Sequence, residues 1–158
     1  MVKNYYQEFF YNSAYHNEYK QIQKNIYEFT DFVVNVLNIE DIGAVFNETV
    51  TYHDSCSALR ANNIKMQPRK LLSKVKGLKL IEMEECEVCC GFGGTFSVKH
   101  EAISTAMAQQ KVENALSKGA SYIVSTESSC LMHLEGYIKK HNLPLKTIHI
   151  IDILASGW

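Results

Sequence analysis

The chain has 158 residues, of which 46% are hydrophobic and 21% are charged, and its formal net charge is -1 at pH 7. This length and composition predict one globular domain with its own core, and they exclude a disordered or fibrous chain. A nearly neutral chain lacks the strong positive field of a general nucleic-acid or membrane-surface binder, so we expect neither kind of partner.

The N-terminus and the cysteine content predict a cytoplasmic protein. The sequence begins MVKNYYQEFF, without the basic start and apolar run of a secretory signal. No run approaches the roughly eighteen consecutive apolar residues of a membrane span. The cysteines number five, and Cys89 and Cys90 are adjacent, which suits a disulfide framework poorly. We therefore expect free thiols that are available to a metal.

The first 45 residues form a predicted N-terminal helical segment. Between Ile22 and Val36, apolar residues recur at three- and four-residue steps, which places them on one helix face toward the core. Residues 5–19 are dense in tyrosine and phenylalanine. So many rings are rarely all solvated, so we expect them either to pack on this domain or to form a contact surface, which includes possible self-association.

Strands and helices alternate over the rest of the chain. Runs of β-branched and aromatic residues predict strands at 49–53, 78–83, 122–125 and 147–151. Helices are predicted after Pro68, over 97–118 and over 128–142. This order predicts a three-layer α/β fold, with a mainly parallel sheet between helices on both faces, as a single domain over residues 1–158.

Four cysteines follow the ends of three predicted strands. Cys56 follows the first, the pair Cys89 and Cys90 follows the second, and Cys130 follows the third. Because the carboxyl ends of parallel strands open on one edge of the sheet, we expect these thiols to converge. Thiolates select iron-sulfur clusters, zinc or copper(I), and four of them match the usual ligand number of a cluster. The sequence therefore predicts these four cysteines as metal ligands.

Local features support this prediction. Cys130 lies just inside a predicted helix N-terminus, where we expect the dipole and the free amides to lower its pKa. Glycines next to the cysteine pair would let the backbone approach a cluster and donate hydrogen bonds to its sulfurs. These glycines are Gly91, Gly93 and Gly94. His53 and Asp54, at the end of the first strand, either orient ligands or only cap the turn.

Three separated motifs resemble one known family. YHDSC at 52–56, CCGFGGTFSVK at 89–99 and SSCLMH at 128–133 are similar to the cysteine-rich CCG domain of heterodisulfide reductases and of glycolate oxidase iron-sulfur proteins. Within that family they look closest to the lactate utilization protein A branch. The resemblance implies a 4Fe-4S cluster and electron transfer in lactate or glycolate oxidation. It further implies a non-flavin subunit of an oxidoreductase, with other iron-sulfur subunits as partners.

The chain departs from the family pattern at two points. Family members usually carry Cys-x-x-Cys in the last motif, whereas here Cys130 is followed by His133. His133 and Cys86 are therefore both candidates for a further ligand. Such proteins also generally contain two tandem modules, and this chain resembles the second module alone.

Two other interpretations use the same residues. Cys86-x-x-Cys89 together with Cys130-x-x-His133 has the composition of a structural Cys3His zinc site, which would serve subunit assembly. That site would leave two of the four strand-end cysteines without a role. The other interpretation is thiol redox catalysis on a disulfide, which the resemblance to heterodisulfide reductase implies.

Overall fold

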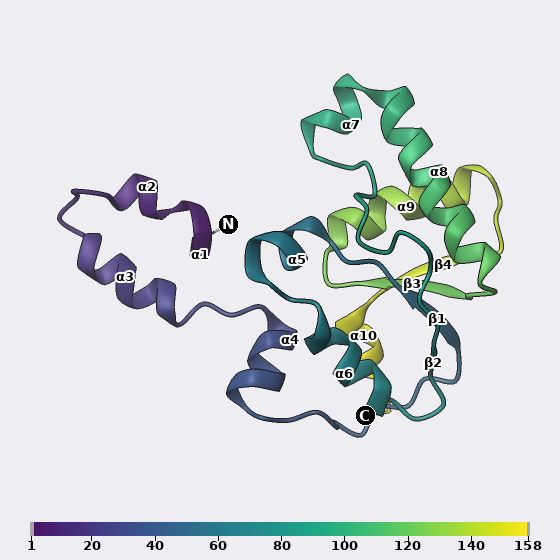
Figure 1. Ribbon diagram of the computed structural model, residues 1–158, viewed down its shortest axis with the longest axis horizontal. Coiled ribbons are helices and arrows are strands. Elements are labelled where there is room, and N and C mark those ends of the chain that lie inside the picture. Colours follow the sequence, from purple (N-terminus) through teal and green to yellow (C-terminus); the bar gives the residue numbers. More distant parts are fainter. Residues whose placement is uncertain (1, 158) are drawn as a thin grey trace.

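A four-stranded sheet organises the computed structural model, which describes residues 2–157 (Figure 1). The strands are β1 (Thr49–Tyr52), β2 (Lys79–Leu80), β3 (Tyr122–Ser125) and β4 (Lys146–His149). They lie in the order β2-β1-β3-β4, and each neighbouring pair is parallel. All the strands therefore end at the same edge of the sheet, as the alternation of strands and helices predicted.

Helices precede the sheet and connect its strands. The N-terminal ones are α1 (Val2–Tyr5), α2 (Gln7–Phe10), α3 (His16–Lys24), α4 (Phe29–Asp31) and the π-helix η1 (Phe32–Val36). The others are α5 (Cys56–Asn62), α6 (Met66–Lys74), α7 (Thr95–Lys99), α8 (Glu101–Ser117), α9 (Ser128–Lys140) and α10 (Ile150–Leu154). Among residues 2–157, none of the helices combines the length and apolarity needed to cross a bilayer.

Alternate strand residues face two separate helix layers. Val50 and Tyr52 of β1 share a buried cluster with residues of η1, α6 and α10. Ile123 of β3 belongs to a second cluster with α8 and α9. Successive side chains of a strand point to opposite faces, so helices cover the sheet on both sides. Figure 1 shows α8 and α9 above the sheet and α6 and α10 below it, which confirms the predicted three-layer α/β fold.

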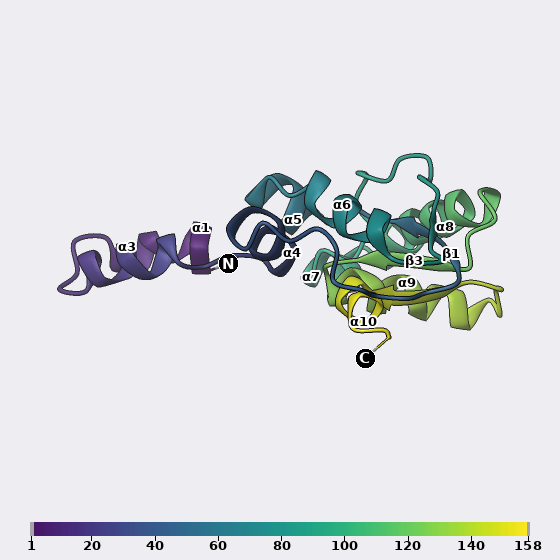
Figure 2. The same ribbon diagram turned by 90° about the horizontal axis from the view of Figure 1, so that it is seen from below.

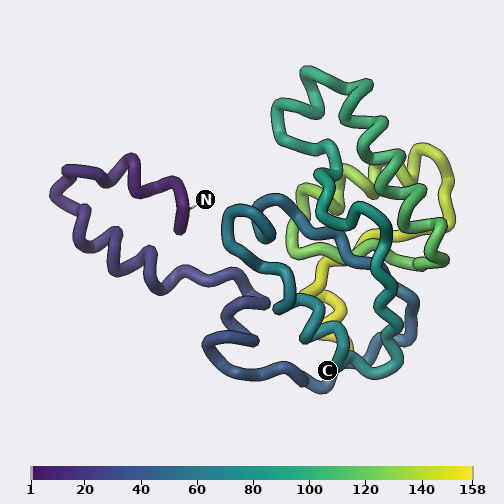
Figure 3. The backbone as a smooth tube through the Cα atoms, in the orientation of Figure 1, coloured from purple at the N-terminus to yellow at the C-terminus, as the bar shows by residue number. Residues whose placement is uncertain are grey.

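The helices α1 to α3 extend away from the body (Figures 2 and 3). They pack on one another: the Tyr19 hydroxyl donates to the Val2 carbonyl at 2.9 Å, and its ring stacks on Phe10 with centroids 5.1 Å apart. Asn4 joins this arm to α5 by donating a 2.7 Å hydrogen bond to the Ala61 carbonyl. The arm therefore has its own small packing and a narrow attachment.

Much of the arm's apolar surface is exposed. Phe9 is 77% exposed and Ile22 is 55% exposed, whereas Val33 in η1 is buried. The predicted inward stripe is therefore correct at Val33 and wrong at Ile22 and at Val36, which is 42% exposed although it lies in η1. A contact surface made by the exposed rings, including self-association, stays a prediction.

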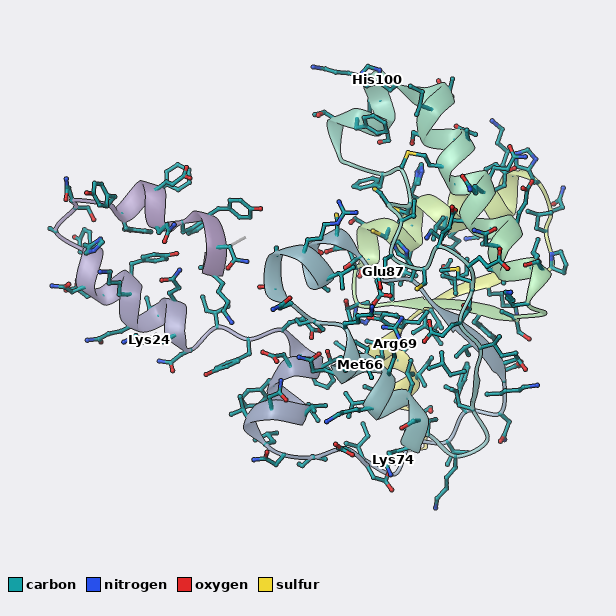
Figure 4. The ribbon with its side chains drawn as sticks, in the orientation of Figure 1. Lys24, Met66, Arg69, Lys74, Glu87 and His100 are labelled. Carbon is teal, nitrogen blue, oxygen red and sulfur yellow. The ribbon has the colours of Figure 1, made fainter. Side chains whose placement is uncertain are left out.

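Local hydrogen bonds move several predicted boundaries. Glu28 caps a new helix, since its carboxylate accepts from the Thr30 N–H at 2.9 Å, so the predicted first helix is interrupted. The predicted helix over 97–118 divides into α7 and α8 at His100, at the tip that Figure 4 labels. The fourth strand ends early because the His149 ring accepts from the Ile151 N–H at 3.2 Å and caps α10.

The second strand is also shorter than predicted. Beyond Leu80, the Ile81 N–H still donates to the Val50 carbonyl at 2.9 Å. The Met83 N–H instead donates to the Thr51 hydroxyl at 3.0 Å, so a side chain replaces the backbone partner. The chain leaves the sheet there and begins the loop that carries the cysteine pair.

Candidate metal centre

His53 is fixed at the carboxyl end of β1. Its N–H donates to the Val124 carbonyl at 2.8 Å, and its carbonyl accepts from the Ser125 hydroxyl at 2.9 Å. Tyr52 faces the layer of η1, α6 and α10, so the next side chain points to the opposite layer. The imidazole is therefore held by the sheet itself, and it is 1% exposed.

Two cysteines lie beside this histidine. Cys90 is in the loop after β2, and Cys130 is in the first turn of α9. One ligand atom from each of His53, Cys90 and Cys130 lies within 4.8 Å of the other two, and all three residues are buried. The predicted convergence of strand ends therefore holds for Cys90 and Cys130, and His53 joins them.

The chemistry of this trio suits a metal. Buried polar atoms are nearly always hydrogen-bonded, yet both ring nitrogens of His53 lack a partner within the described part of the chain. Imidazole nitrogen and thiolate sulfur are ligands that zinc and iron accept in proteins. The five cysteines are all free thiols. These residues therefore fit a thiophilic metal ion or an iron-sulfur group.

The two buried thiols shift each other's pKa in opposite directions. The pKa of Cys90 is lowered, mainly by the neighbouring Cys130 thiol, with smaller contributions from His53 and the Phe92 N–H, against the opposing effect of burial. The proximity of Cys90 and burial raise the pKa of Cys130. The expectation of a lowered pKa at Cys130 is therefore wrong, although this residue does lie at a helix N-terminus. Of the two, Cys90 therefore ionises more readily, because the neighbouring thiol stabilises its negative charge.

Cys56 and Cys89 lie outside the group of three. Cys56 is exposed and begins α5, rather than lying in a loop, because the Ser55 hydroxyl caps that helix by accepting from the Ala58 N–H at 3.3 Å. Cys89 is half-buried, and its sulfur accepts from the Gly91 N–H at 3.4 Å. Donation from glycine amides to the sulfurs of a cluster stays a prediction. Coordination by these two cysteines stays a prediction.

The first turns of α5 and α9 are tied together by Glu127. Its carboxylate accepts from the Ser57 hydroxyl at 2.8 Å and from the Ser129 hydroxyl at 3.0 Å. Each serine is adjacent in sequence to a predicted ligand: Ser57 follows Cys56, and Ser129 precedes Cys130. After the proximity of Cys90 and burial, the charge of Glu127 adds to the raised pKa of Cys130.

A buried hydrogen-bond network holds the turn after the cysteine pair. Gly91 has φ +94°, and its carbonyl accepts from the buried Ser104 hydroxyl at 2.8 Å. His133 Nε2 lies 3.2 Å from that hydroxyl oxygen, and because the Ser104 proton is directed to Gly91, the histidine is the donor. His133 therefore contacts the loop through Ser104. Gly93 and Gly94 also have positive φ values.

Cys86 belongs to a separate group on the other side of the loop. Its sulfur lies within 4.8 Å of carboxylate oxygens of Asp54 and Glu87. Burial, followed by the charges of Asp54 and Glu82, raises the pKa of Cys86. Nearby carboxylates thus oppose thiolate formation, and among residues 2–157 the four members of the predicted Cys3His site form no such close group.

Arg69 neutralises this acidic corner. Its guanidinium makes two hydrogen bonds to Asp54, at 2.8 and 2.7 Å, and two to Glu82, at 2.7 and 3.0 Å. It also lies over the Tyr52 ring, 5.0 Å from the centroid. Figure 4 shows Arg69 near the loop that carries Glu87. Since Asp54 follows His53, this ion pair anchors the strand end that carries the imidazole.

Arg69→Lys will lower the free energy of unfolding by about 1.5 to 3 kcal/mol, because a lysine keeps the charge and loses the paired hydrogen bonds to buried Asp54. Lys70→Ala is the control, since it removes an exposed pair with Glu40 and will cost at most about 1 kcal/mol. Urea unfolding of both variants measures this difference. Equal losses would contradict the anchoring role of Arg69.

Comparison with known proteins agrees with this arrangement. A family model described as a cysteine-rich domain, CCG, matches residues 50–135, which span β1 to the middle of α9 and include every cysteine. The chain belongs to the cysteine-rich CCG domain family. The resemblance inferred from the three sequence motifs is thus confirmed.

Curated relatives of this CCG domain share one description. Lactate utilization protein A of Geobacillus sp. (strain WCH70) is 39% identical over 99% of this chain and 66% of its own length. Lactate utilization protein A 1 of Bacillus anthracis (strain CDC 684 / NRRL 3495) is 37% identical over 99% of this chain and 65% of its own length. Lactate utilization protein A of Lysinibacillus sphaericus (strain C3-41) is 40% identical over 98% of this chain and 68% of its own length. The chain therefore spans about two thirds of these relatives.

The sequence interpretation assigned His53 to ligand orientation or capping and did not place it among the candidate ligands. The structure instead groups its ring with two thiols. One signal was available, because His53 precedes Cys56 by three residues and ends a buried strand at the edge where the cysteines gather. Its missing hydrogen bonds depend on tertiary packing and had no sequence signal.

Proposed function

We propose that this CCG domain binds an iron-sulfur cluster, of 4Fe-4S type, and transfers single electrons within a cytoplasmic lactate- or glycolate-oxidising complex. The proposal rests on one observation: Cys90 and Cys130 lie beside the buried His53 imidazole, which has no hydrogen-bond partner among residues 2–157. The description of the relatives supports lactate as the substrate of the complex. Cys56 and Cys89, on adjoining elements, complete the proposed set of four cysteine ligands.

The spread of the thiols supports a group larger than one ion. Ligands on a single tetrahedral zinc lie about 3.8 Å apart, because each bond is about 2.3 Å long. The ligand atoms of His53, Cys90 and Cys130 lie within 4.8 Å of one another, a looser limit than this span. Cys56 and Cys89 are not members of this close group.

The surroundings suit electron transfer. An iron-sulfur group supplies one-electron redox chemistry, and hydrogen bonds to its sulfurs and its exposure set the potential. The Gly91 N–H donates to the Cys89 sulfur at 3.4 Å, which is a contact of this kind. Cys56 is exposed, so one side of the site faces solvent, where a partner iron-sulfur subunit would dock. The organic oxidation would take place on another subunit.

Anaerobic purification followed by iron, sulfide and zinc analysis tests the proposal. We expect about four irons and four sulfides per chain, together with an electron paramagnetic resonance signal after reduction. Lactate will reduce the cluster only after partner proteins are added, so the isolated chain is the control. Stoichiometric zinc without sulfide would overturn the proposal in favour of a structural zinc site. Dithiol oxidation without any metal would favour thiol redox catalysis.

A further inference from the structure

The His53 imidazole occupies a costly position unless something binds it. The side chain is 1% exposed, and neither ring nitrogen has a hydrogen-bond partner within residues 2–157. A neutral imidazole carries one donor and one acceptor, and a buried group of this kind left unpaired costs about 1 to 3 kcal/mol. Folds retain such costs where a ligand or a metal satisfies the group.

The position of the ring is set by the sheet. Both backbone groups of His53 bond to β3, through the Val124 carbonyl and the Ser125 hydroxyl. The next residue, Asp54, is held by two hydrogen bonds from Arg69. The imidazole therefore projects from a rigid support, which is the arrangement that accurate metal coordination requires.

The atoms beside the ring are metal ligands. A His53 ring nitrogen and the sulfurs of Cys90 and Cys130 lie within 4.8 Å of one another, so small side-chain movements would bring them to the separation of about 3.8 Å found around one tetrahedral metal atom. A neutral nitrogen ligand also adds no negative charge to a buried site that already contains thiolate. Sequence position alone would instead make His133 the histidine ligand, yet its Nε2 donates to Ser104.

We propose that His53 is itself a ligand of the metal group held by Cys90 and Cys130, which makes the site a mixed nitrogen and sulfur centre. The identity of the group as an iron-sulfur cluster rests on the proposed function, whereas the coordination by imidazole does not. Iron-sulfur centres with histidine ligands have higher reduction potentials than centres with thiolate ligands alone. The inference therefore predicts a higher potential than four cysteine ligands alone would give.

Nuclear magnetic resonance of the full chain labelled with ¹⁵N-histidine tests the coordination directly. Zinc alone serves as the probe, added in one equivalent to the reduced, metal-free protein. We expect one ring nitrogen of His53 to move to the chemical shift of metal-bound imidazole, while the exposed His100 ring stays unchanged as the internal control. If His53 keeps its metal-free shifts while the thiols bind zinc, the inference is overturned.

A variant series adds a second readout. Cobalt(II) titrations of the metal-free chain report affinity and ligand type through visible absorption. His53→Gln will weaken binding by at least about 10-fold and shift the bands, since loss of even an outer hydrogen-bond partner of a ligand costs 10- to 100-fold. His100→Gln is the matched control and will bind as the wild type does. An unchanged spectrum and affinity in His53→Gln would overturn the inference. If that variant fails to fold, the resonance experiment on the wild-type chain decides instead.

The two proposals fail separately. Absence of sulfide in anaerobic material, combined with the zinc-induced shift at His53, would remove the iron-sulfur function and keep the histidine ligand. Conversely, His53→Gln protein with wild-type iron, sulfide, potential and paramagnetic signal would remove the histidine ligand and keep the iron-sulfur function.

Discussion

Cys130→Ser will leave the chain without its iron-sulfur group. The Cys130 sulfur belongs to the tightest group of ligand atoms, and its thiol is what stabilises the Cys90 thiolate. A serine hydroxyl is a hard, poorly ionised donor that iron in a sulfur site binds weakly. After anaerobic reconstitution, we expect iron and sulfide to fall from about four of each per chain to near zero. Chemical analysis and electron paramagnetic resonance measure the loss.

Cys86→Ser is the matched control for this substitution. The Cys86 sulfur lies beside the carboxylates of Asp54 and Glu87 rather than beside the buried thiols, and burial followed by the charges of Asp54 and Glu82 raises its pKa. We expect this variant to retain wild-type iron and sulfide. Circular dichroism of both variants separates loss of the metal from loss of the fold. A Cys86→Ser protein as depleted as Cys130→Ser would instead make Cys86 a ligand of the iron-sulfur group.

The layout of the site was predictable because it follows from strand order. Four apolar runs separated by helical patterns require a parallel sheet, and a parallel sheet brings the residues after its strands to one edge. Cys90 and Cys130 are more than thirty residues apart in the sequence, and the structure places their sulfurs within 4.8 Å of each other. No local pattern could show that contact, yet the topology implied it.

The details that sequence reasoning could not give depend on single tertiary contacts. A helix N-terminus lowers the pKa of an isolated cysteine, but here the proximity of the two buried thiols lowers the pKa of Cys90 and raises that of Cys130. In the same way, the His149 ring ends β4 by capping α10. The prediction that the apolar face of α3 points to the core was wrong for another reason. Amphipathic periodicity shows that a helix has an apolar face, and it does not show what covers that face.

Gly91→Ala will destabilise the fold by about 2 to 5 kcal/mol and weaken metal binding. A side chain at φ +94° is strained, and a Cβ there would lie 2.6 Å from the Ser104 carbonyl oxygen and 2.9 Å from the Met107 Cβ. The Ser104 backbone is part of α8 and cannot retreat easily, so the turn itself must move. That movement would withdraw the Gly91 N–H from Cys89 and displace the adjoining Cys90.

Gly119→Ala separates the effect of the close approach from the effect of backbone strain. Gly119 has φ +70°, and a Cβ there would meet nothing within 4 Å, so we expect a loss of only about 1 to 2 kcal/mol. Urea unfolding of the metal-free chains measures both changes without the stabilisation that bound metal adds. After reconstitution, Gly119→Ala will contain wild-type iron and Gly91→Ala will contain less. Equal stability and equal iron in the two variants would show that the turn after the cysteine pair tolerates a side chain at Gly91. That result would contradict the steric conflict expected between this side chain and Ser104.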